Sequence, residues 1–341
     1  MDNFVNDAPQ VLKESKNKIK VDFERTSRLE RMKIKYLSMS YLGLVVWKLF
    51  RFLLLVGVSY VILYPFFSKI AASFMSAEDF VDVTVKLIPK YPTLDTYKAI
   101  IVDLKYFEGL FNTFLVSLFC AVIQTFMSCV IGYGFAKFKF PGSKFLFACV
   151  IFTMIVPHST IQLSLFMKFK YFDIFGIIKL ITGDTIELTN TYFPLAFLSL
   201  GGLAFKNGLY IFLMRQFFKG VPDELEESAY IDGSGIFRTF VQIILPLSVP
   251  MMITVFMFAF SWQWTDEFYV GMFFTKNKTY LLPNLVGLTP KSLDTQYAGQ
   301  SLYEAAIQNT IGLMIISPLL IMYLIFQRYL VQGIERSGIT G

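Results

Sequence analysis

Few residues of this sequence have the types and spacing that catalysis requires. The single histidine, His158, cannot complete a His-Glu-x-x-His metal site, and the sequence has no Gly-x-Ser-x-Gly nucleophile elbow. It also has no Gly-x-x-x-x-Gly-Lys-Ser/Thr phosphate loop, and Gly233-Ser-Gly235 is followed by Arg238 where a dinucleotide-binding fingerprint requires glycine. We therefore expect no catalytic residue, no metal site and no cofactor bound by this chain.

An acidic segment at 220–235 has the pattern of a short helix that seats in a groove of a partner protein. Pro222 suits the first helical position, Asp223 and Glu224 complement the positive end of the helix dipole, and Asp232-Gly233 is a typical helix stop. Such a helix is about 15 Å long. The residues expected at its docking surface are Leu225, Glu226, Glu227, Ser228, Ala229, Tyr230, Asp232 and Gly233.

Apolar residues spaced by three and four follow the acidic segment and predict a second helix. They are Ile236, Phe240, Ile243, Ile244 and Leu247. Pro246 and Pro250 then lead into a long apolar stretch. The docking helix is therefore expected to be joined mechanically to a helix that crosses a membrane.

The composition excludes an ordinary water-soluble protein. The 341 residues are 55% hydrophobic and 16% charged, whereas soluble domains have about 25% charged residues. The formal charge of +6, from 31 Lys and Arg against 25 Asp and Glu, is in a membrane protein more often an orientation signal than a nucleic-acid footprint. These values predict an all-α polytopic membrane protein with no nucleic-acid partner.

Six apolar runs are long enough to cross a membrane as helices. They cover about 46–68, 111–136, 145–167, 192–214, 243–265 and 304–327. Nine Lys or Arg residues precede the first run, which places the N-terminus in the cytoplasm, and six crossings return the C-terminus to that side. The predicted organisation is a basic cytoplasmic segment at 1–45, a six-helix transmembrane domain at 46–332 and a cytoplasmic tail at 333–341.

Polar residues in or near the spans are candidates for a solute path. Lys206 and Asn207 lie in the fourth run, where a charge is costly unless it faces protein, water or a partner. Lys206 either contacts a solute or pairs with a carbonyl or carboxylate at a helix break. Trp262, Trp264 and Asp266 lie near the external end of the fifth run, where the tryptophans form either an interfacial belt or a platform for the apolar face of a sugar.

The acidic segment and the proline-containing stretch after it resemble the EAA loop of bacterial ABC importer permeases. The matching residues are Glu227-Ser-Ala-x-x-Asp232-Gly233 and Leu245-Pro-Leu-x-x-Pro250, with Ser228 in place of the usual alanine. Phe260-Ser-Trp-Gln-Trp-Thr-Asp266 is similar to the Trp-Asn-Asp element of the sugar-importer branch, with Thr265 in place of asparagine. The resemblance extends from about residue 50 to the end of the chain.

The resemblance implies a type I ABC importer permease of maltose type, in which the EAA loop at 220–250 contains the cytoplasmic coupling helix. It implies three partners: a second, different permease, an ATPase dimer that holds ATP and Mg²⁺, and an extracellular solute-binding protein. The solute would be a carbohydrate, of oligosaccharide size, and the location the bacterial cytoplasmic membrane. The alternative is an ion-coupled secondary transporter or channel, which would transport by this chain alone.

Overall fold

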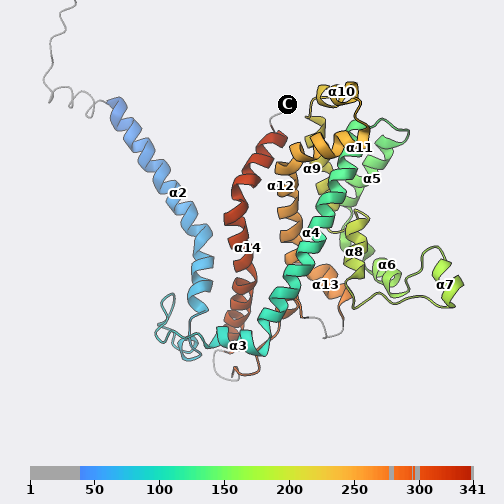
Figure 1. Ribbon diagram of the computed structural model, residues 1–341. Coiled ribbons are helices and arrows are strands. Elements are labelled where there is room, and N and C mark those ends of the chain that lie inside the picture. The colour runs from blue at the N-terminus through green and yellow to red at the C-terminus, as the bar shows by residue number, and fades with distance from the viewer. Residues whose placement is uncertain (1–38, 276–279, 294, 296–299, 339–341) are drawn as a thin grey trace, which may run out of the picture. The chain divides into compact units, whose positions relative to one another are not determined.

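The computed structural model describes residues 39–275, 280–293, 295 and 300–338, and the chain divides into two units, Met1–Pro65 and Phe66–Gly341. In the first unit the structure describes one helix, α2 (Met39–Ala72), which continues beyond Pro65 into the second unit (Figure 1). Most of the large apolar side chains of α2 are exposed, as suits a helix that meets lipid or another chain. Residues 1–38 of the predicted basic segment at 1–45 lie outside the described residues.

Helices form the regular structure of the second unit in its described part, apart from one isolated antiparallel bridge between Phe172 and Ile186. The helices are η1 (Glu78–Phe80), α3 (Asp95–Asp103), α4 (Tyr106–Lys137), α5 (Ser143–Ile155), α6 (His158–Lys170), α7 (Ile177–Thr182), α8 (Phe193–Leu200), α9 (Asn207–Lys219), α10 (Glu224–Ile231), α11 (Ile236–Thr239), the π-helical turn η2 (Phe240–Ile244), α12 (Leu245–Trp264), α13 (Glu267–Phe273), η3 (Leu282–Leu285) and α14 (Gln300–Gly338).

Helix α4 organises the second unit, because it packs along both α9 and α12, while α12 packs in turn against α14 (Figure 1). The buried face of α4 carries small residues, among them Ser117, Ala121 and Ser128. Such residues allow membrane helices to approach closely. At Gly132 a Cβ would lie 2.6 Å from the Cβ of Met214 on α9, so this crossing requires glycine.

Four helices in the described part of the chain are long and apolar enough to cross a membrane: Gly43–Ala72, Tyr106–Lys137, Ile236–Trp264 and Gln300–Leu330. The predicted all-α polytopic class is confirmed. The predicted count of six spans is not confirmed, because the third predicted run is bent by 103° between α5 and α6. The bend lies at Val156-Pro157, and the run would make a fifth span only if the bent pair crosses as one.

The fourth predicted run, 192–214, is divided between α8 and α9 by the segment 201–206. Gly202 has φ +67° and Lys206 has φ +65°, so the backbone leaves the right-handed helical region twice. Hydropathy over a window measures the transfer of side chains into lipid and does not report backbone conformation, so it gives the extent of an apolar run but not whether the run is one helix or two.

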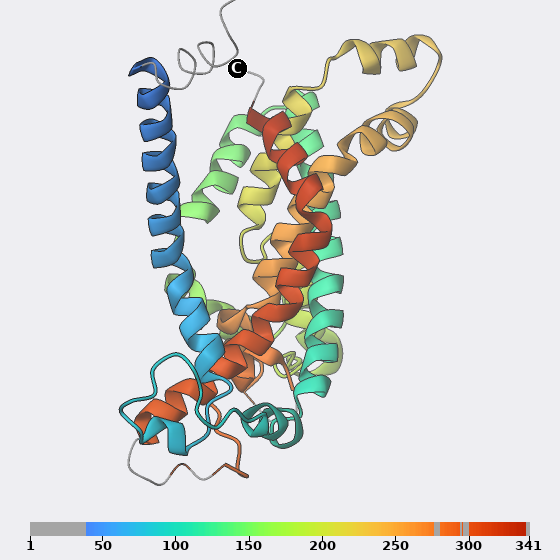
Figure 2. The same ribbon diagram turned by 90° about the vertical axis from the view of Figure 1, so that its left-hand side faces the viewer.

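The two ends of the second unit carry different elements. Helix α14 continues beyond the sixth predicted run, which ends at 327, and extends through Gly338, so the predicted tail at 333–341 is helical up to that residue. The C-terminal end of α14 lies at the same end of the unit as α10, whereas α3 lies at the opposite end (Figure 2).

Candidate functional site

The acidic helix predicted from the sequence is present as α10, Glu224–Ile231. It begins later than predicted, because Asp223 is its N-cap residue and Pro222 precedes it. With 8 residues it is also shorter than the predicted helix. The N-terminal carboxylates nevertheless lie where the helix dipole favours negative charge, as the sequence indicated.

The end of α10 confirms the predicted helix stop. Gly233 has φ +82°, in the left-handed region. The N–H of Gly233 donates to the carbonyl of Tyr230 at 3.0 Å, and the N–H of Ser234 donates to that of Ala229 at 2.9 Å. This pair of bonds is a Schellman motif, and it fixes the direction in which the chain leaves α10.

Glu226 faces α4 rather than the surroundings. Its Oε1 accepts a hydrogen bond from the hydroxyl of Tyr133 at 2.7 Å, and its Oε2 lies 3.7 Å from the ammonium of Lys137. Lys137 also donates to the carboxylate of Asp223, and this bond and the positive charge lower the pKa of Asp223. The predicted docking surface is corrected here, because Glu226 and Ala229 are both buried against the rest of the chain.

The exposed side of α10 retains most of the predicted docking residues. They are Leu225, Glu227, Ser228, Tyr230 and Asp232, followed by Gly233. Two further apolar side chains are exposed beside them: Ile231 is 86% exposed and Phe237 is 80% exposed. These two residues could have been recognised in the sequence, because large apolar residues stand on both sides of a glycine turn in an acidic loop.

The helical segments after the turn join α10 to the membrane-spanning part of the chain. α11, η2 and α12 follow one another without a break from Ile236 to Trp264. The predicted direct connection between the acidic helix and a spanning helix is therefore confirmed. Only the turn at 232–235 separates α10 from this continuous helical segment.

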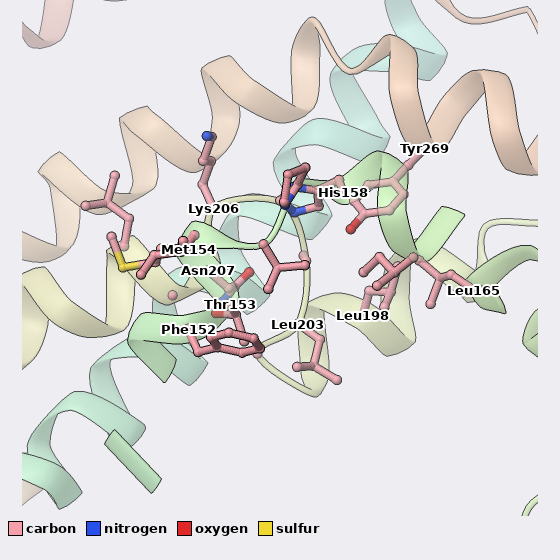
Figure 3. Close-up of a pocket in the computed structure, with 18 residues that line it drawn as sticks. Phe152, Thr153, Met154, His158, Leu165, Leu198, Leu203, Lys206, Asn207 and Tyr269 are labelled. Atoms are coloured by element: carbon pink, nitrogen blue, oxygen red, sulfur yellow. The ribbon is translucent and has the colours of Figure 1, made fainter. Parts of the chain in front are cut away.

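A cavity of about 510 Å³ lies where the two helix breaks meet, beside the bend of α5 and α6 and the segment between α8 and α9 (Figure 3). Most of its lining is apolar. The polar lining residues are Thr153, His158, Lys206, Asn207 and Tyr269. A largely apolar cavity with a few polar groups is the usual form of a small-molecule site.

The ammonium of Lys206 lies beside two aromatic rings. Its Nζ is 5.0 Å from the ring centroid of Phe205 and 5.1 Å from that of Trp262. Among the described residues Lys206 forms no ion pair. The helix break expected beside Lys206 is present. The ammonium of Lys206 is stabilised there by cation–π contacts, each worth about 0.5–2 kcal/mol, and not by a carboxylate.

Asn207 is buried beside the cavity with half of its amide satisfied. Its Nδ2 donates to Oγ of Ser128 on α4 at 3.2 Å. Its Oδ1 has no hydrogen-bond partner in the part of the chain that the structure describes. Because a buried amide oxygen normally accepts a hydrogen bond, Oδ1 is an acceptor left without a partner in a residue that lines the cavity.

Comparison with known proteins decides the family. Residues 107–336 match the family described as binding-protein-dependent transport system inner membrane component. The chain belongs to this family. It is therefore a multi-pass membrane subunit of a transport system.

Relatives of this transport subunit match along most of their length. The galactooligosaccharides transport system permease protein GanQ of Bacillus subtilis (strain 168) is 29% identical over 296 residues, which cover 86% of this chain and 95% of GanQ. The arabinooligosaccharides transport system permease protein AraQ of Halalkalibacterium halodurans is 26% identical over 287 residues, covering 83% of this chain and 93% of AraQ.

A chain in a solved structure has a fold similar to that of this chain. The crystal structure of a bacterial ABC transporter involved in the import of the acidic polysaccharide alginate contains a chain that aligns with a TM-score of 0.63 and 20% identity. The alignment covers 89% of the transport subunit described here and 98% of that chain.

The two tryptophans of the predicted solute path occupy different environments in this transport subunit. Trp262 is 45% exposed and contacts Lys206, whereas Trp264 is 1% exposed. The indole N–H of Trp264 donates to the carbonyl of Ile315 on α14 at 2.9 Å. This corrects the predicted position of Trp264, which is a packing residue between α12 and α14.

Asp266 is likewise part of the protein interior. It is the N-cap residue of α13, where Oδ1 accepts from the N–H of Tyr269 at 2.9 Å and Oδ2 accepts from Nε2 of Gln263 at 3.2 Å. Burial raises the pKa of Asp266 to about 6. Its carboxylate therefore fixes the start of α13 and does not line the cavity.

Proposed function

We propose that this chain is the membrane subunit of an ATP-driven ABC importer that moves a carbohydrate into the cytoplasm by alternating access. Its family membership supports the transport role. The names of the relatives GanQ and AraQ, which refer to galactooligosaccharides and arabinooligosaccharides, support a solute of oligosaccharide size.

The exposed face of α10 is the observation that carries the coupling role. It presents apolar side chains, including Leu225 and Ile231, together with the carboxylate of Glu227. An apolar centre with a polar rim is typical of a protein interface. We assign this face to an ATPase dimer, which binds ATP and Mg²⁺ and performs hydrolysis, while this chain binds no cofactor and catalyses no reaction.

The proposed orientation places α10 and both termini in the cytoplasm. The C-terminal end of α14 lies at the same end of the second unit as α10 (Figure 2). Lys137, Lys139 and Lys144 flank the connection between α4 and α5 at that end, and the N-terminal segment is basic. Lysine and arginine are enriched in cytoplasmic loops, which supports this side as the cytoplasmic one.

Two further partners complete the proposed assembly. The family description, in which transport depends on a binding protein, supports an extracellular solute-binding protein as a partner. The resemblance to maltose-type importers supports a second, different permease, which would share the solute path with this chain.

The cavity at the helix breaks is the proposed point of solute contact. The unpaired Oδ1 of Asn207 would accept a hydrogen bond from a sugar hydroxyl. Trp262 offers a partly exposed indole face beside the ammonium of Lys206. Trp262→Ala should raise the KM for uptake with little change in ATP hydrolysis, whereas Trp47→Ala, at an exposed tryptophan of α2, is the matched control.

Reconstitution of the complete complex tests the proposed function. This chain, its partner permease and the ATPase dimer in liposomes should take up a labelled oligosaccharide only with ATP and the solute-binding protein. Glu227→Lys should reduce both uptake and stimulated ATP hydrolysis, because a reversed charge at an interface costs affinity. Uptake by this chain alone, driven by an ion gradient, would contradict the proposal and support a secondary transporter.

A further inference from the structure

Tyr133 connects three elements at the end of α4 that lies beside α10. Its ring centroid is 5.5 Å from that of Phe218, near the end of α9, and 4.8 Å from that of Phe240 in η2. Its hydroxyl donates to Glu226 on α10. One side chain of α4 therefore contacts α9, α10 and the helix that leads into α12.

Lys137 holds α10 to α4 at a second point. Its ammonium donates to the carbonyl of Val221 at 2.7 Å and to the carboxylate of Asp223, and it lies 3.7 Å from Glu226. The side chains of Lys137 and Glu226 are 7% and 9% exposed. Removing one partner of such a desolvated pair leaves the other charge unpaired, so this contact resists separation far more than a surface ion pair does.

The same helix contacts two of the helices that border the cavity, α8 and α9. Oγ of Ser128 on α4 accepts from Asn207 at the start of α9, and Nε2 of Gln124 donates to Oγ of Ser199 in α8 at 3.2 Å. Ser128 precedes Lys137 on α4 by about 14 Å along the helix axis. Helix α4 thus contacts α10 through Tyr133 and Lys137, and it contacts α8 and α9 through Gln124 and Ser128.

The covalent link from α10 to α12 is a more deformable route. It passes through Gly233-Ser-Gly235, where Gly233 has φ +82° and a Cβ at either glycine would meet no atom within 4 Å. Glycine loses more conformational freedom on ordering than any other residue, and little packing restrains it here. A turn of this kind transmits an axial push poorly unless a second contact supports it.

We propose that Lys137, Tyr133 and Glu226 form a clamp through which α10 and α4 move as one body, so that a displacement of α10 reaches the cavity through α4. Lys137 and Tyr133 are positioning residues in this arrangement, because they act through Glu226 and touch no solute. The inference rests on the proposed function of α10 as the ATPase-docking helix. It adds to that function the route by which a displacement of α10 reaches the cavity, namely α4.

Substitution of Lys137 in the assembled complex tests the clamp. The readout is the number of solute molecules taken up per ATP hydrolysed. Lys137→Met should lower this ratio by about tenfold, Tyr133→Phe should lower it by about threefold because only a hydroxyl is lost, and Lys137→Arg should retain it. Lys139→Met, which removes an exposed positive charge from the same connection, should leave the ratio unchanged. An unchanged ratio in Lys137→Met, with or without a lower yield of complex, would overturn the clamp.

A covalent bridge separates joint movement from simple stabilisation. Lys137→Cys and Glu226→Cys are combined with Cys149→Ala, since Cys149 is exposed whereas Cys120 and Cys129 are buried, and the new cysteines are joined by a short bismaleimide. The unbridged variant should be uncoupled, and the bridge should restore uptake per ATP. A bridge that blocks uptake would mean that α10 moves relative to α4, which contradicts the proposal. Unmodified complex is assayed in parallel, so that absence of its ATP-driven uptake counts against the proposed function and not against the clamp alone.

Discussion

The indole N–H of Trp264, at the end of α12, donates to the backbone carbonyl of Ile315 in α14. Pro318 lies inside α14 just after this point and lacks the N–H that would complete the helical bonding of the preceding turn. The carbonyl of Met314 in the same turn accepts the hydroxyl of Tyr106, from the start of α4, at 2.8 Å. Two other helices thus hold α14 where its own hydrogen bonding is weakest.

Trp264→Phe should lower the stability of the protein more than Trp262→Phe. The first change removes a buried hydrogen bond, which costs about 1–3 kcal/mol when a carbonyl loses its partner. The second change affects a side chain that is 45% exposed, and surface substitutions usually cost less than about 0.5 kcal/mol. Thermal unfolding of the complex in detergent measures the difference. Equal losses of stability would show that the Trp264 bond contributes nothing.

Gly233→Ala should weaken coupling, whereas Gly235→Ala should not. A Cβ would meet no atom within 4 Å at either position, so the pair differs mainly in backbone conformation. Gly233 has φ +82° and Gly235 has φ −77°. Forcing alanine into the left-handed region costs roughly 1–2 kcal/mol, which would redirect the chain after α10. Uptake and ATP hydrolysis are measured together, and coupling that is equally intact in both variants would contradict the role of the Schellman motif.

Asp266 should make stability depend on pH in the mildly acidic range. Its pKa is raised by burial to about 6, so between its unfolded pKa and that value the folded chain keeps a proton that the unfolded chain releases. Stability therefore falls as pH rises through this window, by up to about 3 kcal/mol. Asp266→Asn keeps an N-cap acceptor and should abolish this slope.

The exposed neighbour Glu267 provides the control for the Asp266 experiment. Glu267→Gln also removes one carboxylate, but at an exposed position in the first turn of α13. Denaturant unfolding at a series of pH values should give the unmodified slope for Glu267→Gln. A slope that persists in Asp266→Asn would mean that another group is responsible.

Gly208→Ala should disrupt the cavity by separating α9 from α5. A Cβ at Gly208 would lie 2.7 Å from Oγ1 of Thr153 and 3.0 Å from the carbonyl oxygen of Val150. Overpacking of this kind typically costs about 1–3 kcal/mol. Gly134→Ala on α4 is the matched control, because a Cβ there would meet no atom within 4 Å. Unfolding and solute affinity report the effect, and identical behaviour of the two variants would rule out a close contact at Gly208.

Local features of this chain were predictable because their physical cause is local. The helix stop at Gly233 follows from the freedom of glycine at positive φ, and the continuity of the segment after Ile236 follows from apolar residues at helical spacing. The helix break before Asn207 was one of the alternatives that Lys206 raised, but the 103° bend between α5 and α6 was not predicted in its size, since it lies inside an apolar run whose hydropathy is that of a span. A window average does not distinguish one helix from two.

The sequence by itself determined the helical membrane class, the acidic helix that is present as α10 and the resemblance that the family match confirms. Only the tertiary structure decided which face of that helix is free. Glu226 and Glu227 are adjacent and chemically alike, yet Glu226 is buried against Tyr133 and Lys137 of a helix distant in sequence. Trp262 and Trp264 differ in the same way. Burial depends on which surfaces meet when helices pack, and that pairing is fixed by contacts between distant segments rather than by the spacing of residues along one of them.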